Sequence, residues 1–246
     1  MKGNLLLLLL PLMVLMNCST RKEMGGAPDL PSLLVFYKTA GYYHTSIPSG
    51  LAALQKLGAE NGFKVDTTNN AAKFVQDTLQ KYDAVVFLST TQDVLNDTQQ
   101  QAFEQFIRGG GGFVGIHAAT DTEYNWPWYN QLVGAYFDSH PEIQTATIQV
   151  VDKSHLSTSF LPDKWERKDE WYNFKNINPD VKVLANLDET SYKGGKNGQN
   201  HPIAWYHTFE GARVFYTGGG HTNESFQEPL FLRHLLGGIQ YVLQKE

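Results

Sequence analysis

Short apolar runs and helically spaced apolar positions alternate along the first half of the chain. Four runs have the length and composition of buried strands: 33–38 (LLVFYK), 63–67, 83–89 (DAVVFLS) and 112–117 (GFVGIH). Between them, leucines recur with helical spacing over 48–61, and Asn96 and Asp97 are typical caps for a helix that continues to Ile107. This order of strands and helices predicts an α/β fold with an open, mostly parallel sheet, right-handed crossovers and helices on both faces.

The second half has a less regular pattern. Segments 144–151 and 182–188 are predicted as strands, joined by a long connection rich in aromatic and charged residues. Segment 211–217 (GARVFYT) is expected to rejoin the main sheet, and 227–244 to close the domain as a helix. We therefore expect a single domain over residues 32–246, with an insert around 140–200.

The chain opens with a lysine and a short apolar stretch. Residues 5–16 are apolar, contain Pro11, and fall short of the ~20 residues that a membrane-spanning helix needs. They predict a signal peptide over residues 1–18. Cys18 stands where the lipobox of bacterial lipoproteins carries its lipidated cysteine, so we expect an exported protein that is lipid-anchored to the membrane, with 19–31 as a tether. The alternative is an ordinary signal peptide with an incidental cysteine.

Composition excludes several classes of function. Cys18 is the only cysteine, so the mature domain contains neither a disulfide nor a catalytic thiol. A formal net charge of -5 without a basic run argues against nucleic acid as a partner. Aromatic residues make up 13% of the chain, which is ample apolar area for a core without disulfides.

Three histidines follow predicted strands directly or in the next loop. His44 lies after the first strand, His117 ends GFVGIH, and His221 follows GARVFYTGGG. Ligands of open α/β sheets bind outside the carboxyl ends of the strands, so these side chains are expected to meet at one edge. Neutral imidazoles bind zinc and similar divalent cations, and they also transfer protons near neutral pH. The sequence lacks a compact HExxH motif, so a metal remains a geometric possibility.

Further polar and aromatic side chains are candidates for the same site. Two carboxylates, Asp121 and Glu170, are candidate acid or base groups beside His117. His234, in the closing helix, is expected to be structural, and Asp169 and Glu170 could instead form a solvated charge pair. Stacking faces and contacts for a sugar are expected from five side chains: Tyr43, Trp126, Trp128, Trp171 and His207.

Several ordered segments together resemble the ThuA-like family, named for trehalose utilisation. They include GYYHTSIPSG, GGGGFVGIHAATDT, WPWYNQLVGAYFDSHP, KDEWYNF, HPIAWYH and GARVFYTGGGHTNESF. The resemblance implies a flavodoxin-like fold similar to class I glutamine amidotransferases. It also implies that the family's shared histidines correspond here to His44, His117, His140, His201 and His221, which are thereby the candidate ligands of a metal ion. His117 then occupies the position of the amidotransferase cysteine, and an imidazole cannot form the glutamyl thioester, which excludes that activity.

The resemblance implies a role in sugar metabolism, which leaves three functions open. The first is an enzyme that acts on a disaccharide, glycoside or keto-sugar, with a histidine as general base or ligand and a divalent cation such as zinc as a possible aid. The second is a lipid-anchored carbohydrate-binding protein without catalysis. The third is a partner-docking domain that kept the fold, since fold alone does not determine function.

Overall fold

The structure is a computed structural model that describes residues 30–244. The predicted signal peptide, Cys18 and residues 19–29 of the predicted tether lie outside the described residues. Within the described range, none of the helices has the length and apolar character needed to cross a membrane.

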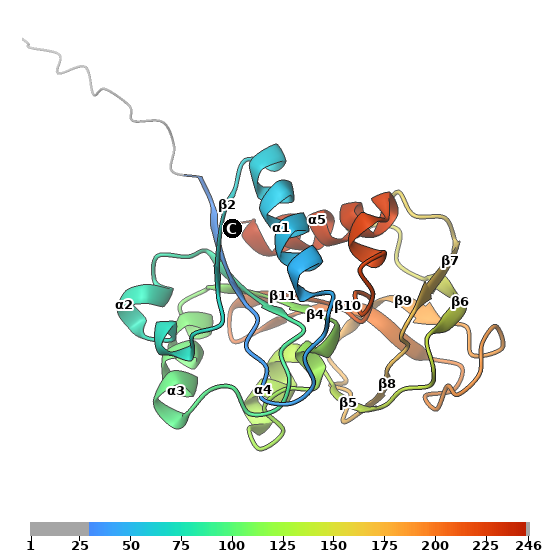
Figure 1. Cartoon of the computed structure of the whole chain (residues 1–246), viewed down its shortest axis with the longest axis horizontal. Helices are drawn as coiled ribbons and strands as arrows, with labels where there is room; N and C mark the ends of the chain where they lie inside the picture. Colours follow the sequence, from blue (N-terminus) through green and yellow to red (C-terminus); the bar gives the residue numbers. More distant parts are fainter. Residues whose placement is uncertain (1–29, 245–246) are drawn as a thin grey trace, which may run out of the picture.

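The first half alternates strands and helices as predicted (Figure 1). Asn96 caps α3 through the amide of Gln99, whose side chain binds back to the backbone of Asn96, so the polar pair predicts where this helix begins. One short helix, α2, was not predicted. The elements are β1 (Ser32–Phe36), α1 (Ile47–Asn61), β2 (Lys64–Thr68), α2 (Gln76–Leu79), β3 (Ala84–Leu88), α3 (Asp97–Arg108) and β4 (Gly112–Ile116).

The second half contains the predicted strands and the closing helix, and also elements that the pattern did not reveal. The unpredicted ones are α4, β5, β7, β8 and β10. In chain order the elements are α4 (Pro127–Val133), β5 (Tyr136–Ser139), β6 (Gln144–Val150), β7 (Lys164–Asp169), β8 (Asn173–Lys175), β9 (Lys182–Leu187), β10 (His201–Phe209), β11 (Ala212–Thr217) and α5 (Pro229–Leu243).

Within residues 30–244 the main sheet has nine strands, in the order β2-β1-β3-β4-β11-β10-β9-β6-β7. The strands from β2 to β11 are parallel, as predicted, whereas β10, β9, β6 and β7 are added antiparallel. The expectation of a mostly parallel sheet therefore holds for one half and is wrong for the other. The change occurs at a two-residue hairpin between β10 and β11, where Glu210 and Gly211 both have positive φ (48° and 89°), as a type I′ turn requires.

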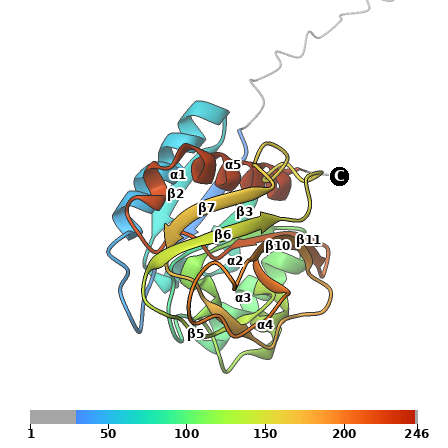
Figure 2. The ribbon, with the colours of Figure 1, turned by 90° about the vertical axis from the view of Figure 1, so that its right-hand side faces the viewer.

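Helices cover both faces of the sheet. Figure 2 shows α1 and α5 above it and α2, α3 and α4 below it. On the lower side, Phe74, Phe87, Phe103 and Phe113 form a buried aromatic cluster with ring centroids 5.4–6.0 Å apart. On the upper side α5 packs so closely on β4 that a Cβ on Gly112 would lie 2.2 Å from Val242. Apolar burial on both faces is what makes β3 and β4 continuous apolar runs.

The direction of the strands decides which loops meet at one edge. The four antiparallel steps from β11 to β7 reverse the direction an even number of times, so β7 runs parallel to β11. The carboxyl end of β7, at Asp169, therefore points to the same side of the sheet as the ends of β1, β4 and β11. The segment predicted as an insert supplies β6, β7 and β9 to this sheet.

Candidate metal centre

Three histidines and one glutamate converge at the carboxyl edge of the sheet. His44 comes from the loop after β1, His117 from the end of β4, Glu170 from the end of β7 and His221 from the segment after β11. One ligand atom from each of them lies within 4.8 Å of all the others. We call these four residues the histidine cluster. His44, His117 and His221 are the three histidines that the strand pattern predicted to lie at one edge of the sheet.

His117 lies at the centre of the histidine cluster and is fully buried. Its φ of 51° is in the left-handed region, at the sharp turn between β4 and a 3₁₀ turn over His117–Thr120. Its Nδ1 lies 2.9 Å from the carbonyl oxygen of Gly218, so Nδ1 carries the proton and donates it. Nε2 then presents a lone pair to the cluster, 3.2 Å from His221 Nδ1. A backbone carbonyl commonly orients metal-bound histidines in this way.

Glu170 connects the histidine cluster to the solvent side. Its Oε2 lies 3.0 Å from His221 Nδ1 and 3.6 Å from His117 Nε2, and its Oε1 lies 3.0 Å from His140 Nδ1. Burial by itself would raise the pKa of Glu170, but the close approach of the His117 and His221 imidazoles outweighs it and holds the pKa well below its usual value. Glu170 is therefore a carboxylate.

His44 is a neutral imidazole with an unsatisfied ring nitrogen. It is buried, and its ring meets those of His117 and His221 edge-on at 4.8 and 5.1 Å. Burial, followed by the proximity of these two rings, lowers the pKa of His44 to about 2. Its Nδ1 is buried without a hydrogen-bond partner, which is costly unless something binds there.

The donor set of the histidine cluster fits a divalent cation. It offers neutral imidazoles and a carboxylate, the ligand types of zinc. The contacts among His117, His221 and Glu170 measure 3.0–3.6 Å. Two ligand atoms of a tetrahedral zinc ion are about 3.3 Å apart when each bond is about 2.05 Å. The spacing of these three ligand atoms is thus close to that of a zinc shell, and the ligand atom of His44 lies within 4.8 Å of them.

Two titratable side chains lie next to the histidine cluster without joining it. His140, a predicted metal ligand, is 45% exposed and contacts the outer oxygen of Glu170. Asp121 accepts a hydrogen bond of 2.6 Å from Tyr124. Burial raises the pKa of Asp121, although the Tyr124 hydrogen bond and the nearby His117 oppose this. Both groups therefore lie outside the set of four ligand residues.

Two more predicted site histidines lie outside the histidine cluster: His201, a predicted metal ligand, and His207, a predicted substrate contact. His201 is buried, with Nδ1 2.8 Å from Glu189 Oε1 and Nε2 2.7 Å from the carbonyl oxygen of Tyr172. His207 is buried in β10, with Nε2 3.1 Å from the carbonyl oxygen of Gln131. Both ring nitrogens of His201 thus have protein partners, and His207 faces α4.

Of the predicted stacking residues, Tyr43 is exposed, whereas Trp126 and Trp171 are buried. Tyr43 is 51% exposed in the loop that carries His44. Trp126 and Trp128 stack on each other at 4.9 Å, and their indole N–H groups donate to glutamates of α3 and of the β10–β11 turn. Trp171 is fully buried, and its indole donates to the carbonyl oxygen of Gln144.

Two further aromatic residues lie beside the histidine cluster, and of these Tyr42 was missed in the sequence. Tyr42 is 63% exposed, its ring centroid lies 4.8 Å from that of His44, and its ring is nearly parallel to that of His221 at 6.4 Å. Tyr172 is buried against His117, with ring centroids 4.4 Å apart. The available signal for Tyr42 was its position directly before Tyr43, which was singled out.

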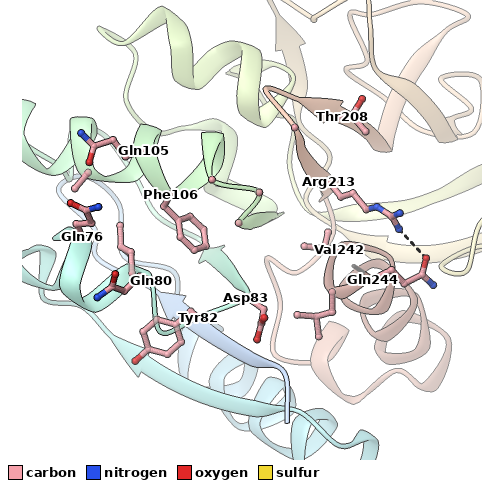
Figure 3. Close-up of a pocket in the computed structure, with 17 residues that line it drawn as sticks. Gln76, Gln80, Tyr82, Asp83, Gln105, Phe106, Thr208, Arg213, Val242 and Gln244 are labelled. Carbon is pink, nitrogen blue, oxygen red and sulfur yellow. Dashed lines mark hydrogen bonds between the residues drawn. The ribbon is translucent and has the colours of Figure 1, made fainter. Parts of the chain in front are cut away.

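A separate cavity lies at the opposite edge of the sheet. Its volume is about 640 Å³, and it opens at the amino ends of β3, β4 and β11 (Figure 3). Phe106 and Val242 line it together with several glutamine side chains. It contains none of the residues of the histidine cluster.

Comparisons with known proteins agree with this architecture. A ThuA-like protein from Bacteroides uniformis has a similar structure (TM-score 0.75, 24% identity, covering 91% of this chain and 96% of that one). Another from Parabacteroides merdae is also similar (TM-score 0.73, 21% identity, 89% and 93%). A β-galactosidase from Bacillus circulans has a similar fold in part of its chain (TM-score 0.55, 13% identity, 87% and 30%). No curated protein matches the chain significantly.

The family itself is established by sequence. The ThuA family profile, described as trehalose utilisation, matches residues 32–242, which is most of the chain. The chain therefore belongs to the ThuA family, and the resemblance in its motifs is confirmed.

Proposed function

We propose that this protein is an enzyme of sugar metabolism whose histidine cluster holds a divalent cation, with zinc as the favoured ion. The observation that carries the proposal is the convergence of His44, His117, Glu170 and His221 within 4.8 Å. Two details support it: the hydrogen bond to Gly218 turns the Nε2 lone pair of His117 toward the cluster, and the buried Nδ1 of His44 lacks a partner.

The chemistry of the site suits a hydroxyl or carbonyl group of a sugar. When bound, a divalent cation would polarise such an oxygen as a Lewis acid. Glu170 holds its negative charge next to the three rings, and His140 and Asp121 are placed at the edge of the cluster to give or take a proton. The exposed rings of Tyr42 and Tyr43 offer apolar faces on which a pyranose ring can stack.

The family description supports a proposal for the class of substrate. Because the ThuA family is described by trehalose utilisation, we propose a disaccharide, a glycoside or a keto-sugar as substrate. The apolar stretch 5–16 and Cys18 further support export and a lipid anchor, which would place the activity at a membrane surface.

The decisive experiment combines metal analysis with a turnover assay. The untagged protein is analysed for bound metal, and then incubated with trehalose, other disaccharides, glycosides and their keto derivatives, with and without EDTA. We expect stoichiometric metal and a product that disappears with EDTA and in His117→Ala. Circular dichroism and the melting temperature verify that this variant folds.

Two outcomes would contradict the proposal. Full turnover by folded His117→Ala would remove the histidine cluster from the reaction. Calorimetric binding of a sugar without product on long incubation would favour a non-catalytic carbohydrate-binding protein, for which the exposed Tyr42 and Tyr43 are equally suited.

A further inference from the structure

Asp169, the residue before Glu170, has a fully buried carboxylate that accepts four hydrogen bonds. Oδ1 accepts from the amides of Glu170 (2.9 Å) and His221 (3.1 Å). Oδ2 accepts from the amide of Gly220 (2.9 Å) and the hydroxyl of Ser225 (2.8 Å). Four donors from three separate segments hold this carboxylate in one orientation.

These bonds join two members of the histidine cluster through their backbones. Glu170 directly follows β7, whereas His221 lies in the segment after β11, 52 residues beyond Asp169 in the chain. A single oxygen, Oδ1, binds both amides, so it determines how far apart the two backbones lie. The side chains of Glu170 and His221 then meet at 3.0 Å.

Arg167 supports the carboxylate from β7. Its guanidinium is buried over the ring of Phe231 at 4.3 Å, and its Nε donates to Glu228 at 2.6 Å. Its Nη2 lies 3.5 Å from Asp169 Oδ2. A paired cation reduces the cost of burying an anion. Arg167 approaches the same oxygen that accepts from Gly220 and Ser225.

The glycines after β11 make this close approach possible. A Cβ on Gly219 would lie 2.5 Å from Arg167 Nη1 and 3.4 Å from Asp169 Oδ2. Gly220 has a φ of 114°, which side chains rarely tolerate. The backbone that carries His221 can thus reach Asp169 because these two positions lack side chains.

We infer that Asp169 is a positioning residue that sets the geometry of the histidine cluster, with Arg167 as its counter-charge. The inference rests on the proposed function, because it assigns Asp169 to the support of the same cation site. Asp169 does not itself lie in the cluster: it acts through the backbones of Glu170 and His221.

The test compares Asp169→Asn with a matched control, Glu123→Gln. Glu123 is also a buried carboxylate and also binds two amides, those of Val94 and Leu95, along with Gln100. Both substitutions remove the charge of a buried carboxylate and retain one oxygen. They should lower stability to a similar degree, while only Asp169→Asn disturbs the histidine cluster.

Two properties are measured for the wild type and for each variant. Zinc affinity is measured by competition with a chromophoric chelator, and amide exchange over the 218–225 segment is measured by mass spectrometry on metal-free protein. For Asp169→Asn we expect zinc affinity to fall about 10- to 100-fold, as for other groups that orient metal ligands, and exchange of this segment to accelerate. For Glu123→Gln we expect neither change.

The outcomes separate this inference from the proposed function. Unchanged zinc affinity in folded Asp169→Asn, or an equal loss in Glu123→Gln, would overturn the inference and leave the metal site intact. If the wild type binds no zinc, the proposed function fails, and the exchange of the metal-free segment alone decides whether Asp169 positions His221. If Asp169→Asn does not fold, Ser225→Ala replaces it, with an expected loss of zinc affinity of about threefold; an unchanged affinity would contradict the inference.

Discussion

A thermal-shift experiment on two histidines tests whether the histidine cluster is the metal site. His221 contributes Nδ1 to the cluster, whereas His201 is buried outside it with both ring nitrogens bonded to the protein. The family resemblance implied both as ligands, and the structure distinguishes them. His221→Ala should abolish the stabilisation by zinc, and His201→Ala should preserve it.

The size of the effect follows from the size of the folded unit. Zinc at 100 times its dissociation constant adds about 2.7 kcal/mol to the free energy of unfolding. The structure describes residues 30–244, and a unit of this length has an unfolding entropy of about 0.45 kcal/mol/K near its melting temperature. The expected increase in melting temperature is therefore about 6 °C for the wild type.

The assay is calorimetric or fluorimetric melting with excess zinc and with EDTA. In EDTA, His201→Ala should melt well below the wild type, since it loses a buried ring and its hydrogen bonds to Glu189 and Tyr172. It should nonetheless gain the full shift of about 6 °C with zinc. A full zinc shift in His221→Ala, or its loss in His201→Ala alone, would refute the ligand assignment.

Two further predictions concern stability and substrate binding. Burial lowers the pKa of His234 from 6.5 to about 4. The stability that its neutral form contributes is therefore complete above pH 6.5 and is lost as the pH falls towards 4, by at most about 3 kcal/mol. Urea unfolding of His234→Gln should show a shallower loss of stability over this range, and an equal loss would exclude His234 as the cause. Tyr42→Ala should raise KM for the sugar about threefold to tenfold with little change in kcat, whereas Tyr42→Phe keeps the ring and should match the wild type. If Tyr42→Ala has the same KM as the wild type, Tyr42 does not belong to the binding site.

The parallel half of the fold and its three histidines could be predicted from the sequence. Continuous apolar runs at β3 and β4 require burial on both faces, and this implies a parallel sheet covered by helices. The carboxyl ends of parallel strands share one edge, so His44, His117 and His221 were placed together without knowledge of any contact.

The aromatic residues could not be assigned in the same way. A tryptophan that packs under a helix and one that lines a binding wall have the same local pattern. Trp126 and Trp128 stack between helices, and Trp171 is buried, whereas the exposed ring next to the histidine cluster is that of Tyr42. Their roles depend on which side chains from distant segments cover them.

The sequence by itself determined the kinds of chemical group that this protein can use and the edge of the sheet where most of them lie. It offers imidazoles and carboxylates, and the domain over residues 32–246 contains no cysteine. The tertiary structure decided which of these groups touch. Glu170 reaches His117 because four antiparallel steps turn β7 back to the direction of β11, and the backbone of His221 is fixed by Asp169, 52 residues away. Contacts of this kind depend on strand direction and register across the whole sheet, which no local pattern of residues encodes.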